Sequence, residues 1–248
     1  MTQRPLSVQL YTLREHLDTD LGAVIRRLAD MGFTAVEPYR FVDYENELAA
    51  ALAETGITAP TAHAKFVGLD QEEIFAAAAR LGIRTVIDPR VADERWTSEE
   101  SIREIAADLN RAAVVAAGHG LTVGYHNHAL EIATRFDGRT ALEVLAESLD
   151  DAVVIELDTY WAAVGGEDPV ALVERLGGRL VALHIKDGPA TDDPKDQVAV
   201  GAGVLPIRRI VEAAPSSALL VVELDDSRQE IFGAVEASRG FLVAEGLA

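Results

Sequence analysis

Residues that bind metals or move protons recur at the ends of short apolar runs along this chain. The runs are GFTAVEPY, TAPTAHAK, TVIDPR, TVGYHNHALE, VVIELDTY, LVALHIKDG and LLVVELDD, and their polar residues are Glu37, His63, Asp88, His126, His128, Glu131, Glu156, Asp158, His184, Lys186, Asp187 and Glu223. A carboxylate at the end of a buried strand is costly unless it has a partner. Because the carboxyl ends of all strands of a parallel barrel meet at one mouth, the recurrence predicts a shared site there.

A divalent metal is the chemistry that the later runs favour. Asp158, His184 and Glu223 lie on three consecutive expected strands. Mn²⁺, Mg²⁺ and Zn²⁺ accept carboxylate oxygen and imidazole nitrogen together. A fourth ligand is expected from the preceding run HNHALE, whose candidates are His126, His128 and Glu131. Strand alternation places the two histidines on the same side. Polar core residues held by hydrogen bonds are the alternative interpretation.

The chain alternates strand-like and helix-like segments from end to end. Strands rich in Val, Ile and Leu are expected near residues 6–12, 33–39, 59–65, 84–90, 121–127, 153–159, 180–187 and 218–225. Helices are expected at residues 21–32, 44–56, 71–82, 98–120, 140–149, 168–178, 206–214 and 230–246. Asp70, Ser98 and Asp168 are the expected N-caps of three of them.

This alternation predicts an α/β fold with a parallel sheet covered by helices. A doubly wound open sheet is the alternative, but eight strands with site residues on most of them favour a (β/α)₈ TIM barrel. The 248 residues match one such barrel and contain no linker, so a single domain over residues 1–248 is expected. The longest irregular segment, residues 188–205, is expected to be functional. Its GAG sequence at 201–203 lacks the strand–helix context of a dinucleotide fingerprint.

Composition excludes several classes of partner and chemistry. The net charge of −19 opposes binding to nucleic acid, whose affinity depends on Lys and Arg. The absence of cysteine rules out disulfides and a thiol nucleophile. The N-terminal residues lack a signal-peptide pattern, and no apolar run approaches the length of a membrane span. We expect a cytoplasmic protein that binds neither membrane nor nucleic acid; a homo-oligomer is compatible with the sequence.

Several segments together resemble the sugar phosphate isomerase/epimerase family, the xylose isomerase-like TIM barrels. They are SVQLYTLRE, GFTAVEPY, TAHAK, GYHNHALE, LDTYWAAVGGEDP, HIKDG, VGAGVLP and VVELDDS. The resemblance extends from Ser7 to about Ser227 and implies a barrel with a divalent metal at its C-terminal mouth. The ketose 3-epimerases of this superfamily bind metal through Glu, Asp, His and Glu. Of these ligands, Asp158, His184 and Glu223 carry over directly.

The first ligand of that set does not carry over directly, because the strand-five Glu is replaced by YHNH. Glu131 is favoured as the fourth ligand because it supplies the missing carboxylate, and His126 is the alternative. The strand-five Glu is also an acid/base residue in the epimerases. The departure therefore leaves open a dehydratase or a lyase acting on oxidised sugars.

The expected reaction is proton abstraction next to the carbonyl of a sugar or keto-polyol, in an isomerase or epimerase. The expected catalytic residues are His126, His128, Lys186 and Glu223. The expected substrate-binding residues are Gln9, Tyr11, Glu37, His63 and Trp161, although Glu37 and His63 could instead orient the ligands. Lys186 could alternatively pair with Glu156 or Asp187.

Three other functions compete with this one. A dehydratase or lyase acting on a keto-inositol or a 3-keto-glycoside would share the first step. A non-catalytic sugar-binding barrel would bind the same small molecules without turnover. An apurinic-site endonuclease with three zinc ions would need more His and Glu ligands than a chain with six histidines offers, and a surface that tolerates DNA.

Overall fold

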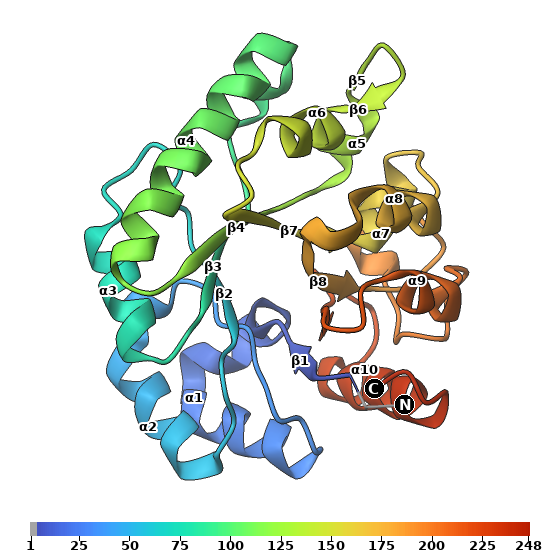
Figure 1. Cartoon of the computed structure of the whole chain (residues 1–248). Coiled ribbons are helices and arrows are strands. Elements are labelled where there is room, and N and C mark those ends of the chain that lie inside the picture. The colour runs from blue at the N-terminus through green and yellow to red at the C-terminus, as the bar shows by residue number, and fades with distance from the viewer. Residues whose placement is uncertain (1–3) are drawn as a thin grey trace.

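The computed structural model describes residues 4–248, and these fold into a parallel barrel surrounded by helices (Figure 1). The ladder of seven parallel strands has the order β1-β9-β8-β7-β4-β3-β2. The strands are β1 (Leu6–Val8), β2 (Thr61–His63), β3 (Thr85–Asp88), β4 (Thr122–His126), β7 (Val153–Asp158), β8 (Leu180–Ile185) and β9 (Leu219–Val222). Each lies inside an expected strand and is shorter than expected.

One more strand was expected, at residues 33–39, between β1 and β2 in the sequence. This segment pairs with both β1 and β2 and so closes the barrel. It forms isolated parallel bridges, Gln9 with Glu37 on one side and Ala35 with Thr58 and Tyr39 with His63 on the other. The pairing is interrupted because Pro38 in this segment and Pro60 before β2 have no N–H to donate. The fold is the predicted α/β barrel, with one strand reduced to bridges by proline.

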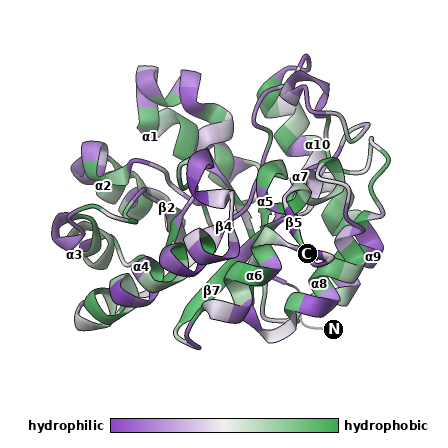
Figure 2. Ribbon diagram, turned by 90° about the horizontal axis from the view of Figure 1, so that it is seen from above, coloured by the Kyte–Doolittle hydropathy of each residue, from purple (hydrophilic) through white to green (hydrophobic). Residues whose placement is uncertain are grey.

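Helices cover the outside of the strands, and their residues alternate between hydrophobic and hydrophilic along each ribbon (Figure 2). The helices are α1 (Arg14–Asp30), α2 (Glu45–Thr55), α3 (Glu72–Arg80), α4 (Glu99–Gly118), α5 (Ala129–Ala133), α6 (Ala141–Ser148), α7 (Thr159–Val164), α8 (Pro169–Leu176), α9 (Ile207–Ala213) and α10 (Ile231–Ala244). Ser98 and Asp168 are N-caps as expected, whereas Asp70 accepts only from Glu72 N, with Gln71 at the cap. No helix in residues 4–248 combines the length and hydrophobicity needed to cross a membrane.

The mouth carries short elements that the sequence pattern did not predict. Helices α5 and α7 begin directly after β4 and β7, and an antiparallel hairpin follows α5, formed by β5 (Arg135–Phe136) and β6 (Arg139–Thr140). Helix α1 is interrupted at Asp20, whose carboxylate accepts a hydrogen bond from Ala23 N at 2.8 Å. The helix expected from residue 21 therefore has its own N-terminus inside α1.

Because successive side chains on a strand point to opposite faces, the polar residues of each strand point into the barrel interior. On β7, Glu156 and Asp158 are two residues apart and point to one side, and Ile155 and Leu157 pack in the apolar core on the other. The register places Asp158 beside His184 of β8 and Glu156 beside His126 of β4. The chemistry of the mouth is therefore fixed by neighbouring strands in the ladder.

Candidate active site

Two overlapping groups of imidazoles and carboxylates occupy the barrel interior. The outer group is His126, Asp158, His184 and Glu223; the inner group is His63, His126, Glu156 and His184. In each group one ligand atom per residue lies within 4.8 Å of the others, and every member is buried. His126 and His184 belong to both groups, so the two groups are neighbours that share two rings.

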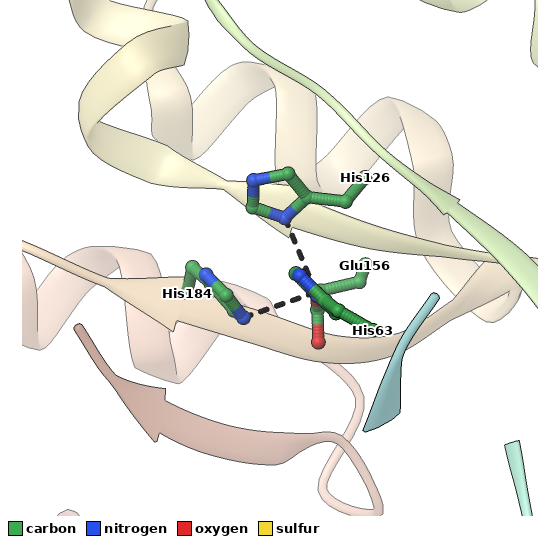
Figure 3. Close-up of side chains that lie close together, drawn as sticks. All are labelled: His63, His126, Glu156 and His184. Atoms are coloured by element: carbon green, nitrogen blue, oxygen red, sulfur yellow. Dashed lines mark hydrogen bonds and ion pairs between the residues drawn. The ribbon is translucent and has the colours of Figure 1, made fainter. Parts of the chain in front are cut away.

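In the inner group, three imidazoles converge on one carboxylate oxygen (Figure 3). Glu156 Oε2 lies 2.6 Å from His63 Nε2, 3.1 Å from His126 Nδ1 and 3.0 Å from His184 Nε2. Glu37 joins this group, because its Oε1 lies 2.7 Å from His184 Nε2 and 3.1 Å from His63 Nε2. Gln9 in turn donates to Glu37 Oε1 at 2.8 Å. The inner group is thus a closed hydrogen-bonded network.

The outer group lies against a buried ammonium. Glu223 Oε2 lies 2.6 Å from His184 Nδ1, and Asp158 Oδ2 lies 3.9 Å from His126 Nε2. Lys186 Nζ lies 2.9 Å from Asp158, 2.8 Å from Glu223 and 2.6 Å from Asp225. Lys186 therefore pairs with these three carboxylates, and neither Glu156 nor Asp187 is its partner.

Each of the two shared histidines points one ring nitrogen toward the outer group and the other ring nitrogen toward the inner group. His126 offers Nε2 to the outer group and Nδ1 to Glu156, and His184 offers Nδ1 to Glu223 and Nε2 to Glu37 and Glu156. A neutral imidazole binds a cation through its unprotonated nitrogen and keeps N–H on the other. If the outer nitrogens bind an ion, the inner ones donate to Glu156 and Glu37. The arrangement therefore accommodates an ion in one group at a time.

Burial and the network together set the pKa values of the shared histidines and of Glu156. Burial lowers the pKa of His184, but the carboxylates of Glu156, Glu223 and Glu37 outweigh it and raise that pKa well above its usual value. Burial, with the charge of His184, puts the pKa of His126 well below its usual value. Burial raises the pKa of Glu156, but His184 and His63 hold it well below its usual value. His126 is therefore a neutral imidazole ready to bind a metal, and His184 would exchange its outer proton for one.

The donor set fits a divalent ion. Asp158 Oδ2, Glu37 Oε2 and Glu156 Oε1 are buried oxygens without a hydrogen-bond partner in residues 4–248, although Lys186 Nζ lies close to Asp158 Oδ2. Burial raises the pKa of Asp158 to about 6 against the opposing charge of Lys186. Buried, unsatisfied carboxylate oxygens are costly, and a cation removes that cost. Mixed imidazole and carboxylate ligands suit Mn²⁺ or Zn²⁺.

The structure does not bring Glu131 to either group. Glu131 is at the third position of α5, where its Oε2 accepts from His128 N at 2.9 Å and its Oε1 accepts from Tyr125 Oη at 2.6 Å. Both oxygens are therefore used in holding the turn after β4. The spacing His128-x-x-Glu131 was a signal for this role, because an acidic residue three positions after an N-cap commonly binds back to the cap.

The remaining expected substrate residues lie above the network or beside it. Tyr11 is 39% exposed at the rim, where it packs edge-on to Tyr39 at 5.2 Å. Trp161 donates from Nε1 to Asp225 at 3.1 Å. A pocket of about 250 Å³ opens beside Trp161 and His128, and Arg90, Asp93 and Glu131 also line it. The His128 ring lines the pocket while its side chain also takes part in the capping box of α5, and its Nδ1 is buried.

Two residues of the site were missed or undervalued in the sequence. Asp225 binds Lys186, Trp161 and Gln197 Nε2, and the signal for it was its position two residues after Glu223. Glu156 was noted as a strand-end carboxylate and as an alternative partner of Lys186, yet it contacts three histidines. Its position two residues before Asp158 was the comparable signal.

The barrel and its carboxylate–imidazole mouth define a class of TIM barrel with a metal-competent site. The family model described as xylose isomerase-like TIM barrel matches residues 25–242. The chain therefore belongs to this family, and the resemblance stated from the sequence is confirmed.

A dehydratase and an isomerase/epimerase are among the named proteins to which this chain is similar. An inosose dehydratase of Geobacillus kaustophilus is 28% identical over 204 residues, which are 71% of this chain and 64% of the relative. The chain thus spans less than two thirds of that relative's length. A sugar phosphate isomerase/epimerase structure from Parabacteroides distasonis superposes with a TM-score of 0.85 at 23% identity, covering 100% of this chain and 96% of that one. The zinc-bound IolI protein superposes with a TM-score of 0.76 at 16% identity, covering 97% of each chain.

Proposed function

We propose that this protein is a metal-dependent enzyme that removes a proton next to the carbonyl of a hydroxylated ring ketone and then eliminates water. Residues 1–248 would form a single catalytic domain, and the substrate is a small keto-polyol or keto-sugar. The single observation that carries the proposal is the outer group, in which two imidazoles, two carboxylates and a lysine surround one point at the barrel mouth.

The proposed metal ligands are His126, Asp158, His184 and Glu223. His126 replaces Glu131 in this set because it lies in the group, whereas Glu131 holds the turn after β4. A divalent ion bound there would polarise the substrate carbonyl and lower the cost of the adjacent carbanion by several kcal/mol. Glu156 and Glu37 would accept the inner N–H groups of the two histidines and so fix their tautomers.

Lys186 and His128 are the proposed acid and base. Burial lowers the pKa of His128 to about 4, so its imidazole is neutral near pH 7, and its ring lines the pocket, where it is the proposed proton acceptor. Burial lowers the pKa of Lys186, but Asp158 and Asp225 outweigh it and keep the ammonium protonated. His128 takes the proton from the carbon next to the carbonyl. The freed electron pair forms the carbon–carbon double bond, and the neighbouring C–OH bond breaks as Lys186 protonates the departing hydroxyl to water.

Dehydration is favoured over epimerisation by the number of free bases at the mouth. Epimerisation needs acid/base groups on both faces of one carbon, and the other carboxylates near His128 are committed. Glu131 is bonded to Tyr125 and to a backbone N–H, and Glu37 lies in the inner network. The 28% identity to an inosose dehydratase supports the same choice. Isomerisation or epimerisation remains the second candidate because it shares the proton-abstraction step.

The test is proton NMR of 2-keto-myo-inositol with the Mn²⁺- or Zn²⁺-loaded protein in D₂O. Loss of the hydrogen next to the carbonyl, together with an unsaturated product or its diketone tautomer, is the expected result. Deuterium incorporation with no loss of water would establish the isomerase/epimerase alternative. Saturable binding without deuterium incorporation or product, with or without metal, would make the protein a sugar-binding barrel and overturn the proposal.

A further inference from the structure

We propose that the substrate of this site carries neither phosphate nor carboxylate: it is an uncharged hydroxylated ketone. The inference rests on the proposed function and names its substrate class. It follows from the two places at the mouth where a TIM barrel commonly binds phosphate, the loop after the seventh barrel strand and a helix N-terminus after the eighth. Here both places already hold carboxylates of the protein itself.

The loop after β8 closes around Asp187. The carboxylate of Asp187 is 1% exposed and accepts from Gly188 N and Gly201 N at 2.9 Å and from Gly203 N and Leu205 N at 3.1 Å. Four converging backbone N–H groups form an anion-binding cradle. The GAG sequence thus supplies such a cradle, and Asp187 fills it.

Glycine is needed in this loop because the backbone packs directly on the carboxylate. A Cβ at Gly203 would lie 2.1 Å from Asp187 Oδ1, and Gly201 has a φ of +91°. The loop is therefore built around Asp187, and a phosphate cannot enter without displacing a buried side chain.

The helix after β9 is occupied in the same way. Glu230, the N-cap of α10, accepts from Phe232 N at 3.2 Å and from Gly233 N at 2.6 Å. These are the N–H groups that would otherwise attract an anion. A side-chain carboxylate satisfies them before any substrate arrives.

The two cations beside these loops are neutralised, and acidic residues outnumber basic ones in both loops. Lys186 contacts three carboxylates, and Arg228 pairs with Asp193 and Asp196. Residues 188–205 contain three Asp and one Lys, and residues 223–230 contain four acidic residues and one Arg. An anionic substrate would meet net negative charge from both loops.

The pocket beside the outer group suits a neutral ring. Arg90 pairs with Asp93 at 2.9 Å, and both oxygens of Glu131 are hydrogen-bonded. Trp161 offers an aromatic wall, and the imidazole of His128 lines the pocket beside it. An aromatic face with hydrogen-bonding groups and little uncompensated charge matches a hydroxylated ring.

The first experiment compares matched neutral and charged ketones on the metal-loaded wild-type protein. The pairs are 2-keto-myo-inositol with 3-dehydroshikimate, and D-fructose with D-fructose 6-phosphate, measured by saturation-transfer NMR for binding and by hydrogen–deuterium exchange for turnover. We expect each neutral member to bind, and kcat/KM to be at least about 10² higher for any neutral member that reacts. Preference for a charged member, in binding or turnover, overturns the inference and leaves the proposed reaction standing.

Failure of the two proposals is distinguishable. If no ketone exchanges, the proposed function fails, and the binding preference alone still decides the charge of the ligand. Equal binding of both members of each pair also counts against the inference.

The second experiment empties the cradle. Asp187→Ala frees the loop amides, and we expect it to bind inorganic phosphate in titrations followed by ³¹P NMR, whereas wild type does not. Asp192→Ala is the matched control, because it removes an exposed negative charge from the same loop and should behave like wild type. Equal phosphate binding by wild type and Asp187→Ala would show that the cradle is not filled, and the inference would fall. If Asp187→Ala does not fold, phosphate binding to wild type decides the point by itself.

Discussion

The inner and outer groups share His126 and His184 but differ in what surrounds them. The inner group is completed by Glu37 and Glu156, which are fully buried and whose carboxylates contact the site histidines, with Gln9 also donating to Glu37. The outer group is completed by Asp158 and Glu223 and lies against Lys186, whose other partner Asp225 is partly exposed. The comparison shows how one pair of rings can serve two groups: each ring turns one nitrogen to the inner carboxylates and the other to the outer ones, where His184 Nδ1 lies 2.6 Å from Glu223.

The largest effect is expected from removing an outer carboxylate. Asp158→Ala should lose bound metal and lower turnover by about 10³ or more, since it removes several kcal/mol of carbonyl polarisation. Metal analysis and NMR turnover measure both. Asp158 Oδ1 also caps α7 through Trp161 N, so Asp158→Asn, which can keep the cap, is the matched control and should lose metal as well. Undiminished metal in both variants would move the ion to the inner group.

His128 should matter for rate and not for metal. His128→Asn keeps a good N-cap residue before α5 and removes the proposed base, so turnover should fall by about 10² to 10⁴ with metal content unchanged. Metal analysis and the rate of deuterium incorporation measure the two effects separately. Full activity would place the base elsewhere, with Lys186 the next candidate.

An inner carboxylate should have an intermediate effect. Glu156→Gln replaces the carboxylate that holds His63, His126 and His184 with an uncharged amide that has a single acceptor oxygen, so metal affinity should fall by about 10- to 100-fold while the outer ligands remain. Titration with Zn²⁺ against a competing chelator gives the affinity. Complete loss of metal, matching Asp158→Ala, would show that the inner group binds the ion directly.

The smallest effect is expected at Glu131. Glu131→Gln should leave metal affinity within about twofold and cost about 1 kcal/mol of stability, because it weakens the bond to His128 N. Chemical denaturation and the same chelator titration report the two quantities. A large loss of metal with normal stability would restore Glu131 as a ligand.

The barrel was predictable because the alternation of strands and helices runs along the whole sequence. Buried runs rich in Val, Ile and Leu alternate with helical segments, and any local error leaves the alternation intact. The segment 33–39 was correctly placed, but its reduction to bridges depends on how Pro38 and Pro60 interrupt one pairing. Helices α5 and α7 were missed because each is at most six residues long and follows a strand directly.

The site was predictable as a set of residues and less so as a set of contacts. Strand-end position brought Asp158, His184 and Glu223 together in the sequence, and the structure places them in one group. The choice between His126 and Glu131 as the fourth proposed ligand depended on where the chain turns after β4. His128 is the N-cap of α5, and Glu131 bonds back to its backbone N–H, which the pattern of the strand alone does not show. Lys186 pairs with Asp225 and not with Asp187, because the carboxylate of Asp187 accepts hydrogen bonds from the loop after β8.

The proline-interrupted segment 33–39 has a consequence for motion. Its backbone bonds to β1 include Glu37 N to Val8 O at 2.8 Å, but its pairing with β2 has gaps. Amide hydrogen exchange should therefore show that this segment opens at a lower free energy than β4, whose ladders with β3 and β7 are both continuous. Each opening carries Glu37 away from His184 while the outer ligands stay in place. During each opening the residues proposed to bind the metal would stay in place. The His184 ring would lose its contact with Glu37 and would be freer to rotate.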